Sequence, residues 1–211
     1  MRRKTWQKEC RLSLWVPTAP AAAPPAAPPQ TNSSVFETPS SGVKREYIRV
    51  DGTLSPQAAY MRKFPGRDGA VWPTVEAKDR MLVEIVTGTP PYGIKLLNTS
   101  QGTWLALKWK KPNVSIAKGV VKAAAIVTLN DFGAFHCNYE LPKWVGPHRG
   151  DIWSVSMDGT IQAWWEDGVT SLVEALYHRT DHIVGFVADP NTYIDRYPEW
   201  MRARLVFEPV A

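Results

Sequence analysis

The sequence predicts an all-β domain, a sandwich or a barrel, that follows a disordered and basic N-terminal arm. Two observations lead to this fold class. Runs rich in β-branched and aromatic residues recur roughly every ten to fifteen residues from Val43 onward, and Gly, Pro, Asn or Asp bounds each of them. Before Val43 the chain is basic and then rich in Pro, Ala and Ser, a composition that buries too little apolar surface to fold. We therefore expect an arm and linker at residues 1–42 and a β-sandwich at residues 43–211.

The arm begins with a cationic head. Five cations lie within residues 2–11, with Trp6 and Glu9 between them: Arg2, Arg3, Lys4, Lys8 and Arg11. The uncharged segment Trp15–Thr31, dominated by Pro and Ala, follows the head, and closely spaced prolines favour polyproline II at about 3.1 Å per residue. This segment is predicted to act as a semi-rigid spacer between the head and the domain.

The net charge is divided unevenly between the arm and the body. Residues 1–45 carry seven Lys or Arg against two acids, whereas residues 46–211 carry eighteen charges of each sign. The whole excess of +5 therefore lies within residues 1–45, and the chain from residue 46 onward, taken alone, has no net attraction for a polyanion.

Eight segments of the body have the composition of strands. In chain order they are VKREYIRV (43–50), RMLVEIVTG (80–88), GTWLALKWKKP (102–112), KAAAIVTLNDFGAFHCNYEL (122–141), DIWSVSM (151–157), TIQAWWEDG (160–168), DHIVGFVADP (181–190) and RARLVFEPV (202–210). Two short helices are also expected. One begins at Ser55 with Pro56 in the first helical position, and the other begins at Thr170, where apolar residues recur at helical spacing: Leu172, Val173, Leu176 and Tyr177.

A β-hairpin is predicted around Asp158-Gly159, between the segments DIWSVSM and TIQAWW. Asp-Gly suits a type I′ turn, in which both central residues have positive φ. A two-residue loop of this type pairs Met157 with Thr160, and it therefore pairs Trp153 with Trp164 across the two strands.

Motifs for catalysis or for a cofactor are missing from the sequence, so we expect no enzyme activity, no cofactor and no bound metal. His178 and His182 are four residues apart, and His136 adjoins Cys137, but neighbouring residues on a strand point to opposite faces and the chain has no CxxC pair. The carboxylates of Glu166-Asp167 are interpreted as turn residues and not as half of a catalytic pair.

The cysteines and apolar segments favour a soluble protein that is not secreted. Cys10 and Cys137 are expected to be free thiols, since a small secreted domain that relies on disulfides has more cysteines. The apolar run LSLWV is shorter than a signal-peptide core, and no run approaches the ~20 residues of a membrane span. The tripeptide Arg149-Gly150-Asp151 matches an adhesion motif, but we interpret it as the turn that leads into the next strand.

Binding to nucleic acid is the chemistry that the residues support best. A cationic arm can follow a phosphate backbone and release its counterions without a fixed groove, and Trp6 can stack on a base. In LKWKKP, a second cluster places cations around Trp109: Lys108, Lys110 and Lys111. On a strand, Lys108 and Lys110 share one face while Trp109 points inward. Simpler interpretations stay open, namely a solvated charge run or a lipid-bound helix for the head and a lysine-protected edge strand for LKWKKP.

The layout of the chain resembles the capsid proteins of small icosahedral positive-strand RNA plant viruses of the tombusvirus and sobemovirus kind, and ourmiavirus coats fit as well. GVKREYIRVDGTLS (Gly42–Ser55) resembles the stretch that opens their shell domain, and MRKFPGRDGAVWPTVEAKDRMLVEI (Met61–Ile85) is similar to the region that follows. The resemblance implies a jelly-roll body that self-assembles into a shell and an arm that packages single-stranded RNA. It also implies a location in the virion and, during assembly, in the host cytoplasm.

Two other functions stay open. One is a carbohydrate- or peptide-binding β-sandwich that uses exposed tryptophans as stacking platforms, with four candidates: Trp104, Trp109, Trp164 and Trp165. The other is a non-capsid viral RNA-binding protein, such as a silencing suppressor or a movement factor. The first predicts a monomer with aromatic residues on one solvent face, and the second predicts RNA binding without a large assembly.

Overall fold

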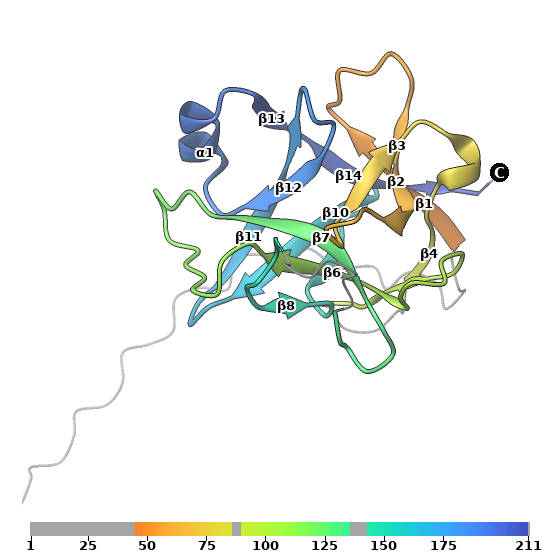
Figure 1. Cartoon of the computed structure of the whole chain (residues 1–211), viewed down its shortest axis with the longest axis horizontal. Helices are drawn as coiled ribbons and strands as arrows, with labels where there is room; N and C mark the ends of the chain where they lie inside the picture. Colours follow the sequence, from red (N-terminus) through yellow and green to blue (C-terminus); the bar gives the residue numbers. More distant parts are fainter. Residues whose placement is uncertain (1–44, 86–89, 136–142, 211) are drawn as a thin grey trace, which may run out of the picture. The chain divides into compact units, whose positions relative to one another are not determined.

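The structure is a computed structural model that describes residues 45–85, 90–135 and 143–210 (Figure 1). Strands supply nearly all of its regular structure, together with a one-turn 3-10 helix, η1 (Ala77–Asp79), and an α-helix, α1 (Pro190–Arg196). The strands are β1 (Arg45–Asp51), β2 (Ala59–Pro65), β3 (Val71–Thr74), β4 (Leu82–Ile85), β5 (Ile94–Leu96), β6 (Trp104–Trp109), β7 (Ala123–Leu129), β8 (His148–Arg149), β9 (Trp153–Val155), β10 (Thr160–Glu166), β11 (Thr170–His178), β12 (Val184–Val187), β13 (Trp200–Arg202) and β14 (Arg204–Pro209).

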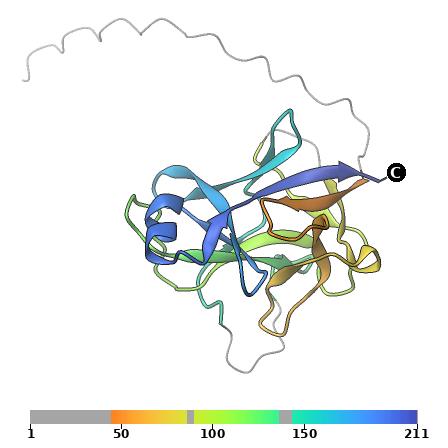
Figure 2. The same ribbon diagram turned by 90° about the horizontal axis from the view of Figure 1, so that it is seen from above.

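The strands close into an antiparallel barrel. Each strand pairs with the next in the order β1, β4, β5, β6, β7, β12, β11, β10 and β14, and β14 pairs with β1 again. β10 completes the circuit, since it pairs with β11 on one side and with β14 on the other. Figure 2 shows β14 in dark blue alongside β1 in orange, in agreement with their register of Glu46↔Pro209 to Asp51↔Arg204. The predicted all-β sandwich or barrel is confirmed at this level.

The interior of the barrel is filled by aromatic and branched side chains. Trp109 and Trp165 meet edge to face, with ring centroids 5.5 Å apart, and Trp153 meets Phe186 in the same way at 6.1 Å. The indole N–H of Trp153 donates to the carbonyl oxygen of Leu105 at 3.0 Å, which satisfies a polar group that the barrel has removed from water. These side chains belong to one continuous core cluster.

Strand β6 is buried on both faces. Leu105, Leu107 and Trp109 point into the barrel, while the alternate residues Ala106 and Lys108 lie on its outer side. The outer side of β6 and β7 is covered in turn by Phe135, which follows β7, and by Trp144 and Ala70 from more distant parts of the chain. A strand that is covered on both faces loses the alternation of apolar and polar residues that marks an exposed sheet.

The two helices expected from the sequence are wrong, because both segments form strands. After Ser55, whose hydroxyl accepts a hydrogen bond from the backbone N–H of Gln57, the chain enters β2 and pairs with β1 and β3. The segment after Thr170 forms β11, which pairs with β10, β12 and β13. A helix at either place would have left these neighbouring strands without their backbone partners.

The one α-helix of the described residues begins at Pro190, the last residue of a segment predicted to form a strand, and continues to Arg196, where no element was predicted. Asp189 caps α1, since its carboxylate accepts from the backbone N–H of Thr192 at 3.1 Å, and Pro190 occupies the first helical position. The Asp-Pro signal was therefore present in the sequence. The helix packs Tyr193 against Leu176 on the outer face of β11.

The Asp158-Gly159 hairpin forms between β9 and β10, but its register is one residue away from the prediction. Trp153 pairs with Ala163 and not with Trp164. As a result the two tryptophans are not cross-strand partners: Trp153 is fully buried, whereas Trp164 is 37% exposed and donates its indole N–H to the hydroxyl of Ser154.

The turn explains the shift in register. Gly159 has a φ of 79°, while Asp158 is not among the residues with positive φ, and a type I′ turn requires both. Backbone hydrogen bonds from Gly159 to Ser156 (2.9 Å) and from Ser156 to Thr160 (3.0 Å) define a three-residue loop with a type I turn followed by a left-handed glycine. The carboxylate of Asp158 holds this turn by accepting from the hydroxyl of Ser156 and the backbone of Thr160.

Candidate nucleic-acid interface

Most of the predicted nucleic-acid contacts belong to the head of the arm. Arg2, Arg3, Lys4, Trp6, Lys8 and Arg11 lie outside the described residues, as do Cys10, His136 and Cys137. Their assignment stays a prediction from the sequence. The remaining three contacts, Lys108, Lys110 and Lys111, belong to the end of β6 and the connection to β7.

Lys108 is buried, with 8% of its surface exposed. Its ammonium donates to the carbonyl oxygen of Gly146 at 2.9 Å, contacts Nδ1 of His148 at 3.3 Å and lies 4.8 Å from the centroid of the Phe135 ring. Nε2 of His148 lies 3.0 Å from the carbonyl oxygen of Gly133, so in the neutral ring Nε2 carries the proton and Nδ1 accepts from Lys108. Desolvation lowers the pKa of Lys108. Its charge is directed into the protein and is not available to an RNA phosphate.

Lys110 and Lys111 are exposed just beyond β6. Trp109 points into the barrel core, as predicted, with 1% of its surface exposed. Leu107 and Lys108 of β6 pair with β7 on one side and with β8 on the other, so the interpretation of LKWKKP as a lysine-protected edge strand is wrong. Of the three predicted body cations, Lys110 and Lys111 are therefore the two that an external anion can reach.

Two further lysines lie in the same connection and were not predicted from the sequence as nucleic-acid contacts. Lys118 is exposed, and Lys122 is half-buried and donates to the backbone carbonyl of Asn113. The backbone N–H of Lys110 donates to the carbonyl of Ala123 at 3.1 Å, which joins the two ends of the connection. The signal that could have found these lysines is the lack of any Asp or Glu from residue 108 to residue 130.

The tryptophans that a carbohydrate-binding module would need are not gathered on a solvent face. Trp109 and Trp165 are buried against each other in the barrel, and Trp104 is partly covered by the outer cluster around Phe135. Trp164 is 37% exposed and uses its indole N–H within the protein. This arrangement argues against the alternative function as a tryptophan-based sugar- or peptide-binding surface.

The other candidate motifs are used inside the body. Arg149 and Asp151 of the adhesion-like tripeptide form a two-pronged ion pair at 3.2 Å, and Arg149 also contacts Glu166 at 3.4 Å. Nδ1 of His178 accepts from the backbone of Asp181, and Nδ1 of His182 contacts the hydroxyl of Tyr177, so the two rings do not converge on a metal. Within the described ranges, no three His, Cys, Asp or Glu side chains are grouped to hold a metal ion.

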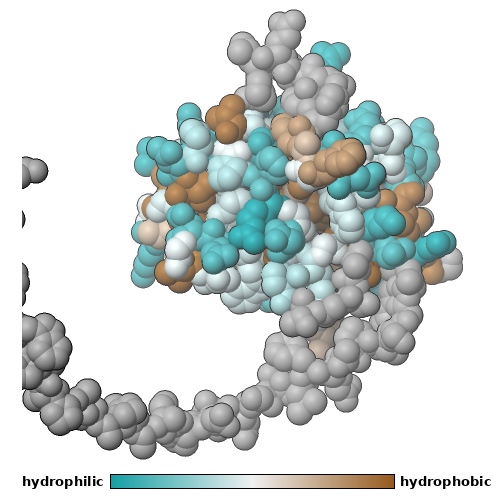
Figure 3. Space-filling view, turned by 90° about the horizontal axis from the view of Figure 1, so that it is seen from below, coloured by the Kyte–Doolittle hydropathy of each residue, from teal (hydrophilic) through white to brown (hydrophobic). Residues whose placement is uncertain are grey.

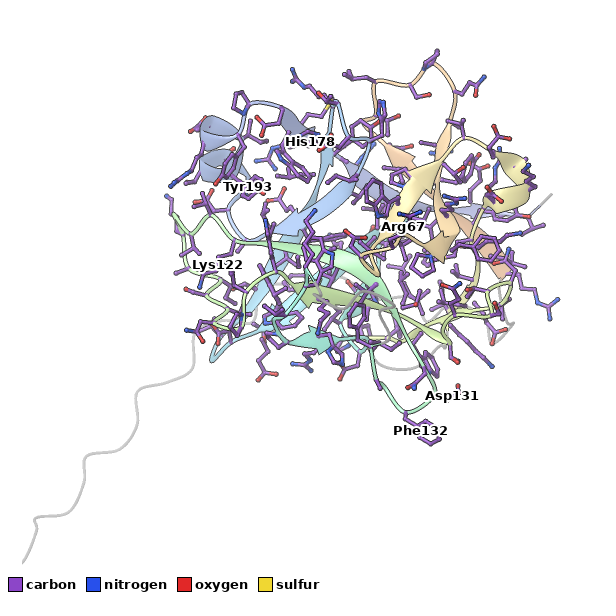
Figure 4. The ribbon with its side chains drawn as sticks, in the orientation of Figure 1. Arg67, Lys122, Asp131, Phe132, His178 and Tyr193 are labelled. Carbon is purple, nitrogen blue, oxygen red and sulfur yellow. The ribbon has the colours of Figure 1, made fainter. Side chains whose placement is uncertain are left out.

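Exposed apolar side chains lie at the tips of ordered turns. Phe132 is 93% exposed and points away from the body in Figure 4, on a turn in which the side chain of Asn130 accepts from two backbone N–H groups. Met157 and Val169 occupy the tips of the two turns that flank β10 and are 95% and 68% exposed. Figure 3 shows that hydrophobic residues on one face of the body form separate patches among hydrophilic residues.

Comparison with family models, curated proteins and solved structures finds no match to this chain. No helix in the described parts of the chain is long and apolar enough to cross a membrane.

Proposed function

We propose that this protein is a viral coat protein whose copies assemble into an icosahedral shell and whose cationic head packages single-stranded RNA. Its partners are other copies of the same chain and the RNA genome, and its location is the virion and, during assembly, the host cytoplasm. The proposal needs no enzyme activity, cofactor or metal.

The observation that carries the proposal is the separation of charge along the chain. The net charge of +5 lies within residues 1–45, and +4 of it belongs to the head, at the far side of an uncharged Pro/Ala segment, while residues 46–211 have no net charge. Cations at the end of a spacer can neutralise phosphates at a distance from the body, and this binding is sensitive to salt and largely indifferent to RNA sequence. A neutral body can pack against its own copies without mutual repulsion.

The body supports the proposal in a more general way. A closed antiparallel barrel leaves few unpaired strand edges, so lateral contacts between copies can be made by surfaces and turns without uncontrolled edge pairing. The exposed turn-tip residues Phe132, Met157 and Val169 are candidates for such contacts. The jelly-roll form of the shell domain, which the resemblance implies, stays part of the proposal.

The role of the head is tested by replacing its five cations with glutamine: Arg2, Arg3, Lys4, Lys8 and Arg11. We expect the purified variant to retain little RNA, measured by its absorbance ratio at 260 and 280 nm. The slope of log K against log salt for RNA binding should fall by about 3.5, since each phosphate contact to a single strand contributes about 0.7.

The matched control has residues 2–14 in scrambled order, so that composition and charge are unchanged. This control should package RNA as the natural chain does, because phosphate contacts depend on charge and not on the order of residues. Unchanged packaging by the glutamine variant would reject the role proposed for the head. RNA binding by a protein that stays monomeric would instead favour the non-capsid RNA-binding alternative.

A further inference from the structure

The neutral body contains an internal charge asymmetry. Residues 108–130 carry five lysines and no acid, whereas residues 150–211 carry ten acids, four arginines and no lysine. The cationic segment includes the connection from β6 to β7, which extends on the left of Figure 1 beside α1. We call this segment, residues 110–122, the lysine connection. It carries four lysines: Lys110, Lys111, Lys118 and Lys122.

The lysine connection is held against the body along its length. Val114 and Ile116 pack on the barrel core, and Val121 packs on the cluster formed by Leu176 and Tyr193. The backbone N–H of Gly119 donates to the carboxylate of Asp189 at 2.8 Å. Because the backbone is fixed at several points, less conformational entropy is lost when the lysines bind a ligand.

The lysines of the connection form no direct ion pair with a carboxylate in the part of the body that the structure describes. Several arginines of the body contact carboxylates directly: Arg49 lies 2.7 Å from Asp51, and Arg149 lies 3.2 Å from Asp151. In the described ranges, no ion pair within 4.0 Å links any of the four lysines to a carboxylate. The carboxylate of Asp189 accepts hydrogen bonds from Gly119 and Thr192, which lower its pKa, and the charge of Lys118 lowers that pKa further without a direct ion pair.

From these observations we infer that the lysine connection is a second phosphate-binding surface, on the body itself, and that its ligand is the backbone of single-stranded RNA. The inference rests on the proposed function, and it identifies the face of the body that is directed toward the genome. Lysine is a compact point charge that pairs with phosphate without a fixed geometry, which suits a flexible strand.

A second copy of the chain is the competing ligand, since its C-terminal region is acidic. Several of those acids already have partners in their own copy: Glu166 pairs with Arg149, Glu174 with Arg202, and Glu208 with Arg49. The acids that are left offer a weaker complement to four lysines than a continuous phosphate backbone, which has one charge per nucleotide.

The test uses the full chain with Lys110, Lys111 and Lys118 changed to glutamine, which leaves the hydrogen bond from Lys122 to Asn113 intact. The probe is a fluorescein-labelled oligouridylate, and its affinity is measured by fluorescence anisotropy over a range of KCl concentrations. The slope of log K against log salt should fall by about 2, from three phosphate contacts at about 0.7 each. A triple change to arginine keeps the charges and should keep the slope.

The matched control changes Lys63, Lys78 and Lys95, which lie on β2, η1 and β5, to glutamine. It removes the same charge from another part of the body and should leave the slope nearly unchanged. Equal slopes for the two glutamine triples would overturn the inference. So would an unchanged slope together with altered self-association in the absence of RNA, because the lysines would then bind a second copy. If the slope falls for the head variant but not for the lysine triple, this inference alone is rejected. If it falls for the lysine triple but not for the head variant, only the role of the head is rejected.

Discussion

Trp164 and Trp165 are neighbours on β10 with opposite environments. Trp165 points into the barrel, where its ring meets Trp109 edge to face, and it is 3% exposed. Trp164 points outward and is 37% exposed. The pair therefore separates the contribution of the barrel core from that of the surface at adjacent positions of a single strand.

We expect Trp165→Ala to lower the free energy of unfolding by about 3–5 kcal/mol, because a large aromatic side chain leaves a cavity that the rigid barrel does not fill. Trp164→Ala is the matched control and should cost less than half as much. Urea denaturation followed by circular dichroism measures both values. Similar losses for the two variants would contradict the assignment of Trp165 to the core.

Lys108 is the residue whose environment differs most from the one that its sequence context indicates. Its position in LKWKKP indicates one of several surface cations. Its ammonium nevertheless lies under Phe135 and between Gly146 and His148. These covering residues come from 27 to 40 positions further along the chain, so no local pattern could have shown the burial. The exposure of Lys110 and Lys111 was predictable, because they lie between a strand and Pro112.

The burial of Lys108 gives a pH dependence with a defined sign. Its pKa is lowered in the folded state from an ordinary value of 10.5. Between the lowered pKa and 10.5 the unfolded chain binds more protons than the folded chain, so stability rises with pH in that window. Lys108→Met should remove this part of the rise below pH 10.5, and exposed Lys110→Met should not. The same pH slope of stability in all three proteins would contradict the burial of the charge.

At the scale of elements, the sequence predicted strands where turn residues bound β-branched runs and failed where one pattern fits two structures. In β11, Val173 and Tyr177 face the barrel while Leu176 packs against α1. Apolar residues on both faces of a strand produce the same spacing as one face of a helix, and only the neighbouring strands decide between them. The hairpin at Asp158 was predicted at the right place, but its loop length was not, because Asp-Gly also ends a type I turn.

The carboxylate of Asp158 is expected to set the loop length of this hairpin. Hydrogen bonds from Ser156 and then from Thr160 lower the pKa of Asp158 to about 2, so the turn is stabilised by the ionised form. This contribution is complete above the ordinary pKa of 3.8 and is lost as the pH falls through about 2. Asp158→Ala should lower the melting temperature at pH 7, and the deficit should shrink toward pH 2. Asp158→Asn keeps one acceptor oxygen, so its melting temperature at pH 7 should lie between those of the natural chain and Asp158→Ala. A deficit that does not depend on pH would contradict this account.

For the molecule as a whole, charge is organised at two levels. Residues 1–45 carry the whole net charge, most of it in the head, and within the body the lysine connection is separated along the chain from an acid-rich C-terminal third. The concentration of net charge in residues 1–45 could be predicted from the sequence by counting charges. The second required the structure, because only the ion pairs show that Arg49, Arg149 and Arg202 contact carboxylates while none of the connection's lysines does so within the described ranges.

The central claim, that copies of this chain assemble around RNA, is tested most directly by size-exclusion chromatography with multi-angle light scattering. The full chain is measured alone and after addition of single-stranded RNA at low salt. The account predicts that RNA converts the protein into particles of uniform mass that contain many copies and elute with the RNA. A protein that keeps the mass of one chain with and without RNA would contradict it.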